Sequence, residues 1–178
     1  FKFKRFNHMC GFFAEYRKKN ITFDKNLFLS SASKIKHRGP DDEGEIFLKN
    51  FSAKFFRLSI LDLSKKANQP MKSRSGRFLI LFNGEIYNFL ELKKKYNFET
   101  QTNSDTEVIL CLFEKFGPEM IKMLEGMFSI IIYDQENLHR YYMMDMGKNN
   151  HQNEYHQYHI FLQYHIRHLM SVALHFYL

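Results

Sequence analysis

The sequence contains no tryptophan, only three prolines and two cysteines among its 178 residues, and no long apolar run. The two cysteines, Cys10 and Cys111, provide no disulfide framework, which favours a reducing cytoplasmic environment over a secreted one. A transmembrane helix needs roughly 18 or more consecutive apolar residues, and residues 1–8 are basic without the apolar core of a secretory signal. These absences predict a cytoplasmic protein without a membrane segment.

The sequence also lacks any strong clustering of its charges. The formal net charge of +7 raises the hypothesis of a basic nucleic-acid-binding module. The lysines and arginines are scattered, however, and the short run at 93–95 is typical of a solvated helix surface. We therefore expect no nucleic-acid partner.

Length and composition indicate one globular domain followed by an unusual tail. Hydrophobic residues make up 44% and charged residues 25% of the chain, as in ordinary globular proteins. From about residue 138 the composition changes: this part holds seven of the nine histidines and has no glycine after Gly147. The sequence predicts a leader at 1–9, a domain at 10–137, and an atypical His/Tyr-rich tail at 138–178, disordered or frameshifted.

Hydrophobic periodicity and turn residues predict alternating strands and helices. Strands are expected at 12–14, 45–48, 53–58, 77–82 and 127–134. Asp24 is a candidate N-cap for a helix that Gly39-Pro40 ends, and Asn88 with Glu91 resembles a capping box. Ser104 with Glu107 resembles a second one, whose helix ends at Gly117-Pro118. This mixed order predicts an α+β fold.

The dipeptide Asn83-Gly84 directly follows the apolar strand predicted at 77–82. Asn-Gly tolerates positive φ and is a strong signal for a tight turn. We therefore expect the strand to end in a turn at this point. Taken by itself, the pair indicates a hairpin and no chemistry.

Cys10 is a candidate nucleophile. A cysteine reacts as its thiolate and needs a base or a local field to form it. A free α-amino group, with a pKa near ~7.7–8.0, can serve as that base if Cys10 is the first residue of the mature chain. Met9 precedes Cys10 and would be removed if it were the start. Taken alone, a small buried residue at the start of a strand is the simpler interpretation.

Cys10 stands at the head of a series of short motifs. In order these are MCGFFAEY (9–16), HRGPDDEG (37–44), FRLSILDLS (56–64), NQPM (68–71), FNGEIYNF (82–89) and SDTEVIL (104–110). Together they closely resemble the glutaminase domain of glutamine-hydrolysing asparagine synthase, a class II glutamine amidotransferase. The resemblance covers roughly residues 9–134. It implies an N-terminal-nucleophile hydrolase fold, a four-layer αββα sandwich.

The resemblance implies a reaction and a role for each matching residue. Cys10 would attack the side-chain amide of glutamine and release ammonia, with the Asn83 amide and the Gly84 N–H stabilising the oxyanion. Arg57 would hold the α-carboxylate of glutamine, and Asp105 its ammonium. Glu85 would lie on the acidic side of the pocket, and Leu58, Ser59, Ile60 and Leu61 would contribute backbone contacts. We expect no catalytic role for His37, and Cys111 fits a buried core residue.

The sequence departs from the family at both ends. The leader before Cys10 would block its α-amino group, so an active form must lose it. No Gly-rich pyrophosphate loop is present, so ATP and Mg would belong to a missing synthase domain, and we expect no cofactor in this one. A separate synthase chain is a possible partner. In the tail, His156, His159, His165 and His168 have helical spacing, but they lack Cys or carboxylate partners, so we expect no metal.

Alternatives remain open. The leading hypothesis is the glutaminase half of an asparagine synthase-like enzyme, which supplies ammonia for ATP-dependent amidation of aspartate. Relatives in this branch aminate sugars or cyclise amino-acid derivatives, and the sequence does not separate these acceptors. The alternative is a catalytically dead fragment or interaction remnant. The oligomeric state is unknown.

Overall fold

The computed structural model describes residues 10–17, 22–59, 62–145 and 159–162. The chain divides into two compact units. The first contains the described residues up to Ser59 together with Asn68–Pro70, and the second contains the described residues 62–67 and 71–145 with 159–162. Each unit is described by itself.

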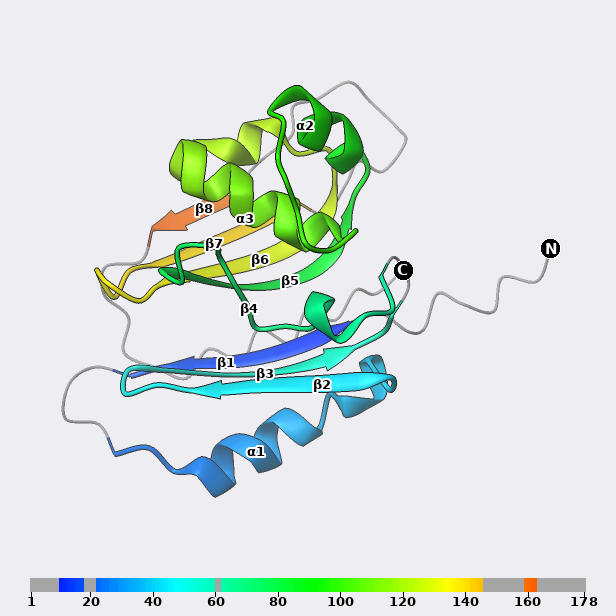
Figure 1. Cartoon of the computed structure of the whole chain (residues 1–178). Helices are drawn as coiled ribbons and strands as arrows, with labels where there is room; N and C mark the ends of the chain where they lie inside the picture. Colours follow the sequence, from blue (N-terminus) through cyan, green and yellow to red (C-terminus); the bar gives the residue numbers. More distant parts are fainter. Residues whose placement is uncertain (1–9, 18–21, 60–61, 146–158, 163–178) are drawn as a thin grey trace, which may run out of the picture. The chain divides into compact units, whose positions relative to one another are not determined.

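The first unit is a three-stranded antiparallel sheet with a helix on one face (Figure 1). Its strands are β1 (Gly11–Tyr16), β2 (Asp42–Phe47) and β3 (Phe51–Arg57), in the order β1-β3-β2. The covering elements are α1 (Lys25–Ser33) and a short 3₁₀ helix, η1 (Lys36–Arg38). The three strands predicted in this part of the sequence are confirmed, with ends shifted by a few residues.

A small aromatic core holds α1 against its sheet. Phe28 and Ala32 of α1 pack with Phe13 and Phe56 of the strands, and all four side chains are buried. The ring centroids of Phe13 and Phe28 lie 5.1 Å apart, within the range of favourable aromatic pairs. Burying an aromatic or aliphatic side chain of this size contributes about 1.5–3 kcal/mol, so this cluster fixes the helix to the sheet.

The predicted cap of α1 is confirmed, whereas its predicted end is wrong. The Asp24 carboxylate accepts a hydrogen bond from Leu27 N at 2.9 Å, which satisfies one free N–H of the first turn. The helix ends at Ser33, well before Gly39. The chain continues in η1, and Gly39 follows that 3₁₀ helix. The glycine therefore ends the helical path but not α1 itself.

The second unit is a five-stranded antiparallel sheet with helices on one face (Figure 1). The strands follow the order β4-β5-β6-β7-β8. They are β4 (Met71–Lys72), β5 (Phe78–Ile86), β6 (Gly126–Asp134), β7 (Arg140–Asp145) and β8 (His159–Leu162). The helical elements are η2 (Lys65–Ala67), α2 (Phe89–Lys95), α3 (Asp105–Phe116) and η3 (Gly117–Met123). Antiparallel sheets together with helices confirm the α+β class.

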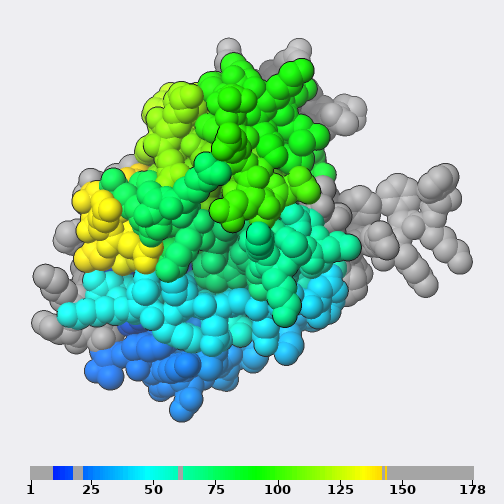
Figure 2. All heavy atoms as spheres, viewed as in Figure 1, coloured from blue at the N-terminus to red at the C-terminus, as the bar shows by residue number. Residues whose placement is uncertain are grey.

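The core of the second unit lies between its sheet and α3. The register pairs Ile80 with Ile132, and both are fully buried in one cluster with Ile109 of α3. The spacing of apolar residues in α3 places one face on the sheet, as the helical period requires. In the space-filling view, α2 and α3 (green) form one continuous surface (Figure 2).

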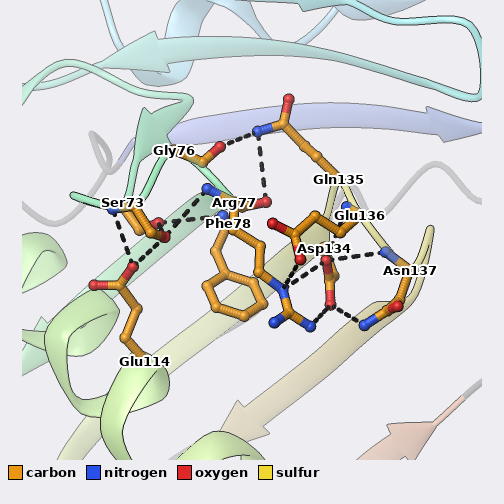
Figure 3. A network of polar contacts seen from close by, with 10 residues as sticks. Ser73, Gly76, Arg77, Phe78, Glu114, Asp134, Gln135, Glu136 and Asn137 are labelled. Atoms are coloured by element: carbon orange, nitrogen blue, oxygen red, sulfur yellow. Dashed lines mark hydrogen bonds and ion pairs between the residues drawn. The ribbon is translucent and has the colours of Figure 1, made fainter.

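A polar network joins the turns at one end of this sheet (Figure 3). The buried carboxylate of Asp134 accepts hydrogen bonds from Arg77 Nε at 3.0 Å and Nη2 at 2.6 Å. It also accepts from the backbone of Glu136 and from Asn137. Burial would raise the pKa of Asp134, but these hydrogen bonds, Arg77's foremost, outweigh it and lower the pKa to about 2. The network ties the start of β5 to the β6–β7 turn.

The predicted tight turn at Asn83-Gly84 is wrong. Strand β5 runs through both residues, and they pair with Ser129 and Phe128 of β6. Gly84 has φ of +146°, and a Cβ at this position would lie 2.1 Å from Met127 O. Glycine is therefore required by close packing against β6 and by its own backbone conformation, not by a reversal of the chain.

The two predicted capping boxes have different outcomes. Ser104 caps α3, with its hydroxyl accepting from Glu107 N, so the N-cap is confirmed. The reciprocal half of this box is wrong, because the Glu107 carboxylate accepts from Thr102 N and Ser104 N donates to Thr102 Oγ1. Asn88 precedes α2, but its side chain donates to Met123 O and accepts from Glu125 N. This predicted box is wrong because the Asn88 amide binds the chain entering β6 and not its own helix.

Candidate functional site

Cys10 directly precedes β1, and its half-buried sulfur contacts the backbone at the end of β3. Leu58 N–H donates a hydrogen bond to Cys10 Sγ at 3.3 Å, and the thiol donates to Leu58 O at 3.5 Å. The antiparallel register pairs Gly11 with Phe56, so the residues just beyond this pair meet at the same end of the sheet. Strand pairing therefore sets the position of the sulfur.

Arg38 holds the backbone of the same cysteine. Its Nε donates to Cys10 O at 3.3 Å, and a Cβ on Gly11 would lie 3.1 Å from Arg38 Cδ. The absence of a side chain at Gly11 therefore leaves room for Arg38. The sequence analysis did not predict this contact. The only sequence feature that points to Arg38 is its place in the HRGPDDEG motif.

Arg57 is the last residue of β3, and its side chain is buried. Its carbonyl oxygen accepts a hydrogen bond from Asp41 N at 3.0 Å. The Asp41 carboxylate accepts in turn from Ser59 N at 2.8 Å. Asp41 is a second residue of the HRGPDDEG motif that sequence reasoning did not single out, and it holds the segment after β3.

Gly39 explains why this motif lies so close to β3. A Cβ at Gly39 would lie 2.2 Å from the backbone of Phe56, a distance that no side chain tolerates. The residues from Arg38 to Asp41 therefore pack directly against the strand end that carries Arg57. The neighbouring His37 is exposed, and its ring nitrogen contacts only Lys34 O in the part of the chain described.

Of the four residues predicted to contribute backbone contacts, the structure describes two. Leu58 and Ser59 follow β3 in the first unit and make the hydrogen bonds described above. Ile60 and Leu61 lie outside the described residues.

In the second unit, Asn83 and Gly84 lie side by side within β5. The Asn83 side chain is buried, with 6% of its surface exposed. Glu85, the next residue along the strand, is exposed. A buried amide such as that of Asn83 is costly unless it has a polar partner, which makes this position chemically distinctive within an apolar strand.

Asp105 is a buried carboxyl at the first turn of α3. It accepts hydrogen bonds from Thr106 N at 2.8 Å and from Ile86 N, at the end of β5, at 3.2 Å. Burial raises the pKa of Asp105 to about 6, the hydrogen bonds oppose this rise, and the nearby Glu85 carboxylate adds to it. The second unit thus places two carboxylates, Glu85 and Asp105, at the same end of β5. The raised pKa of Asp105 is of the kind found at functional sites.

The predicted site residues fall into two groups, one in each unit. Cys10, Arg57, Leu58 and Ser59 belong to the first unit, and Asn83, Gly84, Glu85 and Asp105 to the second. Each group gathers at a strand end or along one strand. Cys111 belongs to neither group: it lies on α3, half-buried, and burial raises its thiol pKa.

The described residues contain no metal-binding cluster of three or more histidine, cysteine, aspartate or glutamate side chains. Of the four tail histidines, His156, His165 and His168 lie outside the described residues, and only the backbone of His159 is described. Within the described part of the chain, no helix is long and apolar enough to cross a membrane.

Comparison with known proteins gives a consistent result. A putative glutamine-hydrolyzing asparagine synthetase 2 of Methanocaldococcus jannaschii is 42% identical over 139 residues, 65% of this chain and 27% of that protein. A probable asparagine synthetase of Schizosaccharomyces pombe is 38% identical over 131 residues, 72% of this chain and 23% of that protein. Asparagine synthetase B of Escherichia coli is 36% identical over 131 residues, which are 72% of this chain and 24% of that protein.

The chain spans about a quarter of the length of these relatives. Its matched region includes Cys10, extends past β7 and ends before β8. The family model described as the glutamine amidotransferase domain matches residues 9–150, and the chain belongs to this family of glutamine amidotransferase domains.

Proposed function

We propose that this domain hydrolyses glutamine to glutamate and ammonia, with Cys10 as the nucleophile. The observation that carries the proposal is the Cys10 sulfur, half-buried and hydrogen-bonded to the Leu58 backbone beside the buried Arg57. Membership in the glutamine amidotransferase family supports the reaction class.

In the proposed reaction, the α-amino group of Cys10 accepts the thiol proton as Sγ bonds to the amide carbon of glutamine. The tetrahedral intermediate collapses as the amide C–N bond breaks, and the proton passes to the leaving ammonia. Water then hydrolyses the thioester to glutamate and regenerates the thiol. This requires an active form that begins at Cys10, because an amide nitrogen cannot act as the base.

The remaining roles follow from side-chain chemistry. The Asn83 amide and the Gly84 N–H would donate to the oxyanion, where losing one donor typically costs ~10²–10³ in rate. The Arg57 guanidinium would bind the α-carboxylate in a bidentate manner. Asp105 would bind the ammonium, with Glu85 adding negative charge. Leu58, Ser59, Ile60 and Leu61 would contribute backbone contacts.

The names of the relatives extend the proposal to a larger enzyme. Each relative is named as a glutamine-hydrolyzing asparagine synthetase, so the ammonia would serve the ATP-dependent amidation of aspartate in the cytoplasm. ATP and Mg would bind a synthase domain or a separate synthase chain, with no cofactor in this domain. We further propose the αββα sandwich of N-terminal-nucleophile hydrolases and a domain that begins at residue 10. Its predicted end at 137 moves at least to the end of β7, because β7 pairs with β6 in one sheet.

The test is a glutaminase assay on chains whose first residue is established by intact mass. A chain expressed from Met9 and processed to Cys10 is expected to release ammonia from glutamine, and Cys10→Ala to release none. Cys111→Ala is the matched thiol control and is expected to keep full activity. A processed and folded chain that releases no ammonia would identify a catalytically dead remnant instead.

A further inference from the structure

The second unit contains a pocket that no proposed role uses. Its volume is about 250 Å³, and it opens between the β4–β5 hairpin and α3. It is lined by side chains from η2, β4, the loop before α3 and α3 itself: Lys66, Met71, Lys72, Ser73, Arg74, Gln101, Thr102, Glu107, Leu110, Cys111 and Glu114. Sites for drug-sized ligands are typically about 300–1,000 Å³, so this pocket suits a smaller molecule.

Three cationic side chains and two carboxylates border the pocket. Lys66 and Lys72 are exposed and form no ion pair with any described residue. Arg74 approaches the Glu99 carboxylate only to 4.0 Å, and both of these side chains are largely exposed. A pair of that kind contributes little, so all three cations remain available to an anion.

The carboxylates of the pocket are engaged by other groups. Glu107 accepts hydrogen bonds from Gln101 N at 2.9 Å and from Thr102, through its N at 2.7 Å and its Oγ1 at 2.6 Å. Glu114 accepts from Ser75 N at 3.3 Å and Ser75 Oγ at 2.5 Å. Neutral donors hold both carboxylates without removing their negative charge, so the three cations of the lining exceed its two carboxylates by one.

Part of the pocket lining is uncharged. Leu110 and Met71 are buried there, and Cys111 also lines the pocket. Burial raises the pKa of the Cys111 thiol, the negative charges of Glu107 and Glu114 raise it further, and Arg74 lowers it. Apolar lining residues in a pocket that also carries three cations favour a short carbon chain with acidic groups.

The walls are held in place by hydrogen bonds. On one side, the Ser73 and Ser75 hydroxyls contact each other at 3.0 Å, and Glu114 anchors Ser75 to α3. Figure 3 shows Ser73 and Glu114 in the network that continues to Asp134. On the other side, Glu107 fixes the loop at Thr102. A pocket with such preorganised walls loses little entropy when a ligand binds.

We propose that this pocket binds a small dicarboxylate anion, with Lys66, Lys72 and Arg74 contacting its carboxylates and Leu110 and Met71 contacting its carbon chain. The proposal is independent of the proposed glutaminase reaction, because none of the lining residues has a role in that reaction. It adds a ligand site to a domain whose other proposed ligand is glutamine.

Isothermal titration calorimetry of the full chain with succinate tests this site. Succinate is expected to bind, and the uncharged isostere succinamide is not. The double variant Lys66→Gln, Lys72→Gln is expected to weaken succinate binding about tenfold or more, as the loss of charge-assisted contacts implies. Lys94→Gln, which removes an exposed lysine outside the pocket, is the matched control and is expected to bind as tightly as the parent.

Cys111 provides a second readout that does not depend on heat. Saturating succinate is expected to slow alkylation of Cys111 by iodoacetamide, measured by peptide mass mapping, and not to do so in the double lysine variant. Equal binding of succinate and succinamide, or unchanged succinate binding in the double variant, would overturn the proposal. Binding of inorganic phosphate without succinate would show that the ligand class is wrong. Each readout is independent of glutamine hydrolysis and also applies to Cys10→Ala.

Discussion

The Sγ atom of Cys10 lies 3.3 Å from the backbone nitrogen of Leu58. The two residues are far apart in the sequence, and the antiparallel pairing of β1 with β3 brings them together. Arg38 fixes the carbonyl group of the same cysteine from another direction. The proposed nucleophile is therefore positioned by backbone pairing and by one guanidinium.

Gly84→Ala should strongly destabilise the protein. The added Cβ would lie 2.1 Å from Met127 O, and the residue would keep a φ of +146° that L side chains rarely adopt. Overpacking and backbone strain together should cost at least about 3 kcal/mol. Urea denaturation measures this change in the free energy of unfolding.

Gly76→Ala is the matched control for Gly84→Ala. Gly76 also has a positive φ, +76°, but a Cβ there meets nothing within 4 Å. Only the conformational cost remains, about 1–2 kcal/mol. Equal losses in the two variants would contradict the packing requirement at Gly84.

Asp134→Asn should lower the free energy of unfolding at pH 7 by about 2–3 kcal/mol. The pKa of Asp134 is lowered to about 2 in the folded protein, so its contribution is present above about pH 4 and is lost as the pH falls toward 2. The difference in the free energy of unfolding between the parent and Asp134→Asn should therefore shrink as the pH falls toward 2.

Glu136→Gln provides the control for Asp134→Asn. The Glu136 carboxylate is exposed and lies 3.4 Å from Arg77 Nε, so this substitution should lower the free energy of unfolding by less than about 1 kcal/mol. Similar losses in both variants would refute the role of the buried network.

Asp105 should contribute more to the free energy of unfolding at pH 5 than at pH 7. This contribution is the difference between the parent and Asp105→Asn at each pH. Its pKa is raised to about 6 in the folded state, so the folded state binds the proton more tightly than the unfolded state and this group's contribution falls as the pH rises toward 6. Between pH 7 and pH 5 the relative gain should be about 1.4 kcal/mol. Parallel pH profiles for the two proteins, measured by urea denaturation, would rule out this raised pKa.

The same carboxyl should control glutamine binding. If Asp105 binds the substrate ammonium, protonation below about pH 6 removes the attracting charge, and the KM for glutamine should rise as the pH falls through this value. Asp105→Asn should show a high KM that no longer changes in this range. A KM that stays constant from pH 7 to pH 5 in the parent would contradict this role.

Local signals in the sequence were sufficient where the residues involved are neighbours in the chain. The Asp24 and Ser104 caps were predictable because each contact spans three residues. The Asn83-Gly84 turn and the Asn88 capping box were wrong because long-range partners decide them: β6 for the first, and Met123 with Glu125 for the second.

In the candidate site, too, the sequence identified residues by local motifs but not their long-range contacts. The residues carried over from the resemblance were identified by motif, without any knowledge of their partners. Arg38 and Asp41 lie in one of these motifs, but their contacts with Cys10 and Ser59 depend on the fold of β3 against Gly39. The pocket beside Cys111 had no sequence signal, because segments distant in the chain line it.

The central claim is that Cys10 is the nucleophile of a glutamine hydrolase, and covalent trapping tests it most directly. The chain processed to Cys10 would be incubated with a diazoketone analogue of glutamine, and the modified cysteine located by peptide mass mapping. The account predicts one adduct, on Cys10 alone, which excess glutamine prevents and which a chain retaining residues 1–9 does not form. Equal labelling of Cys10 and Cys111, or labelling that glutamine does not reduce, would contradict it.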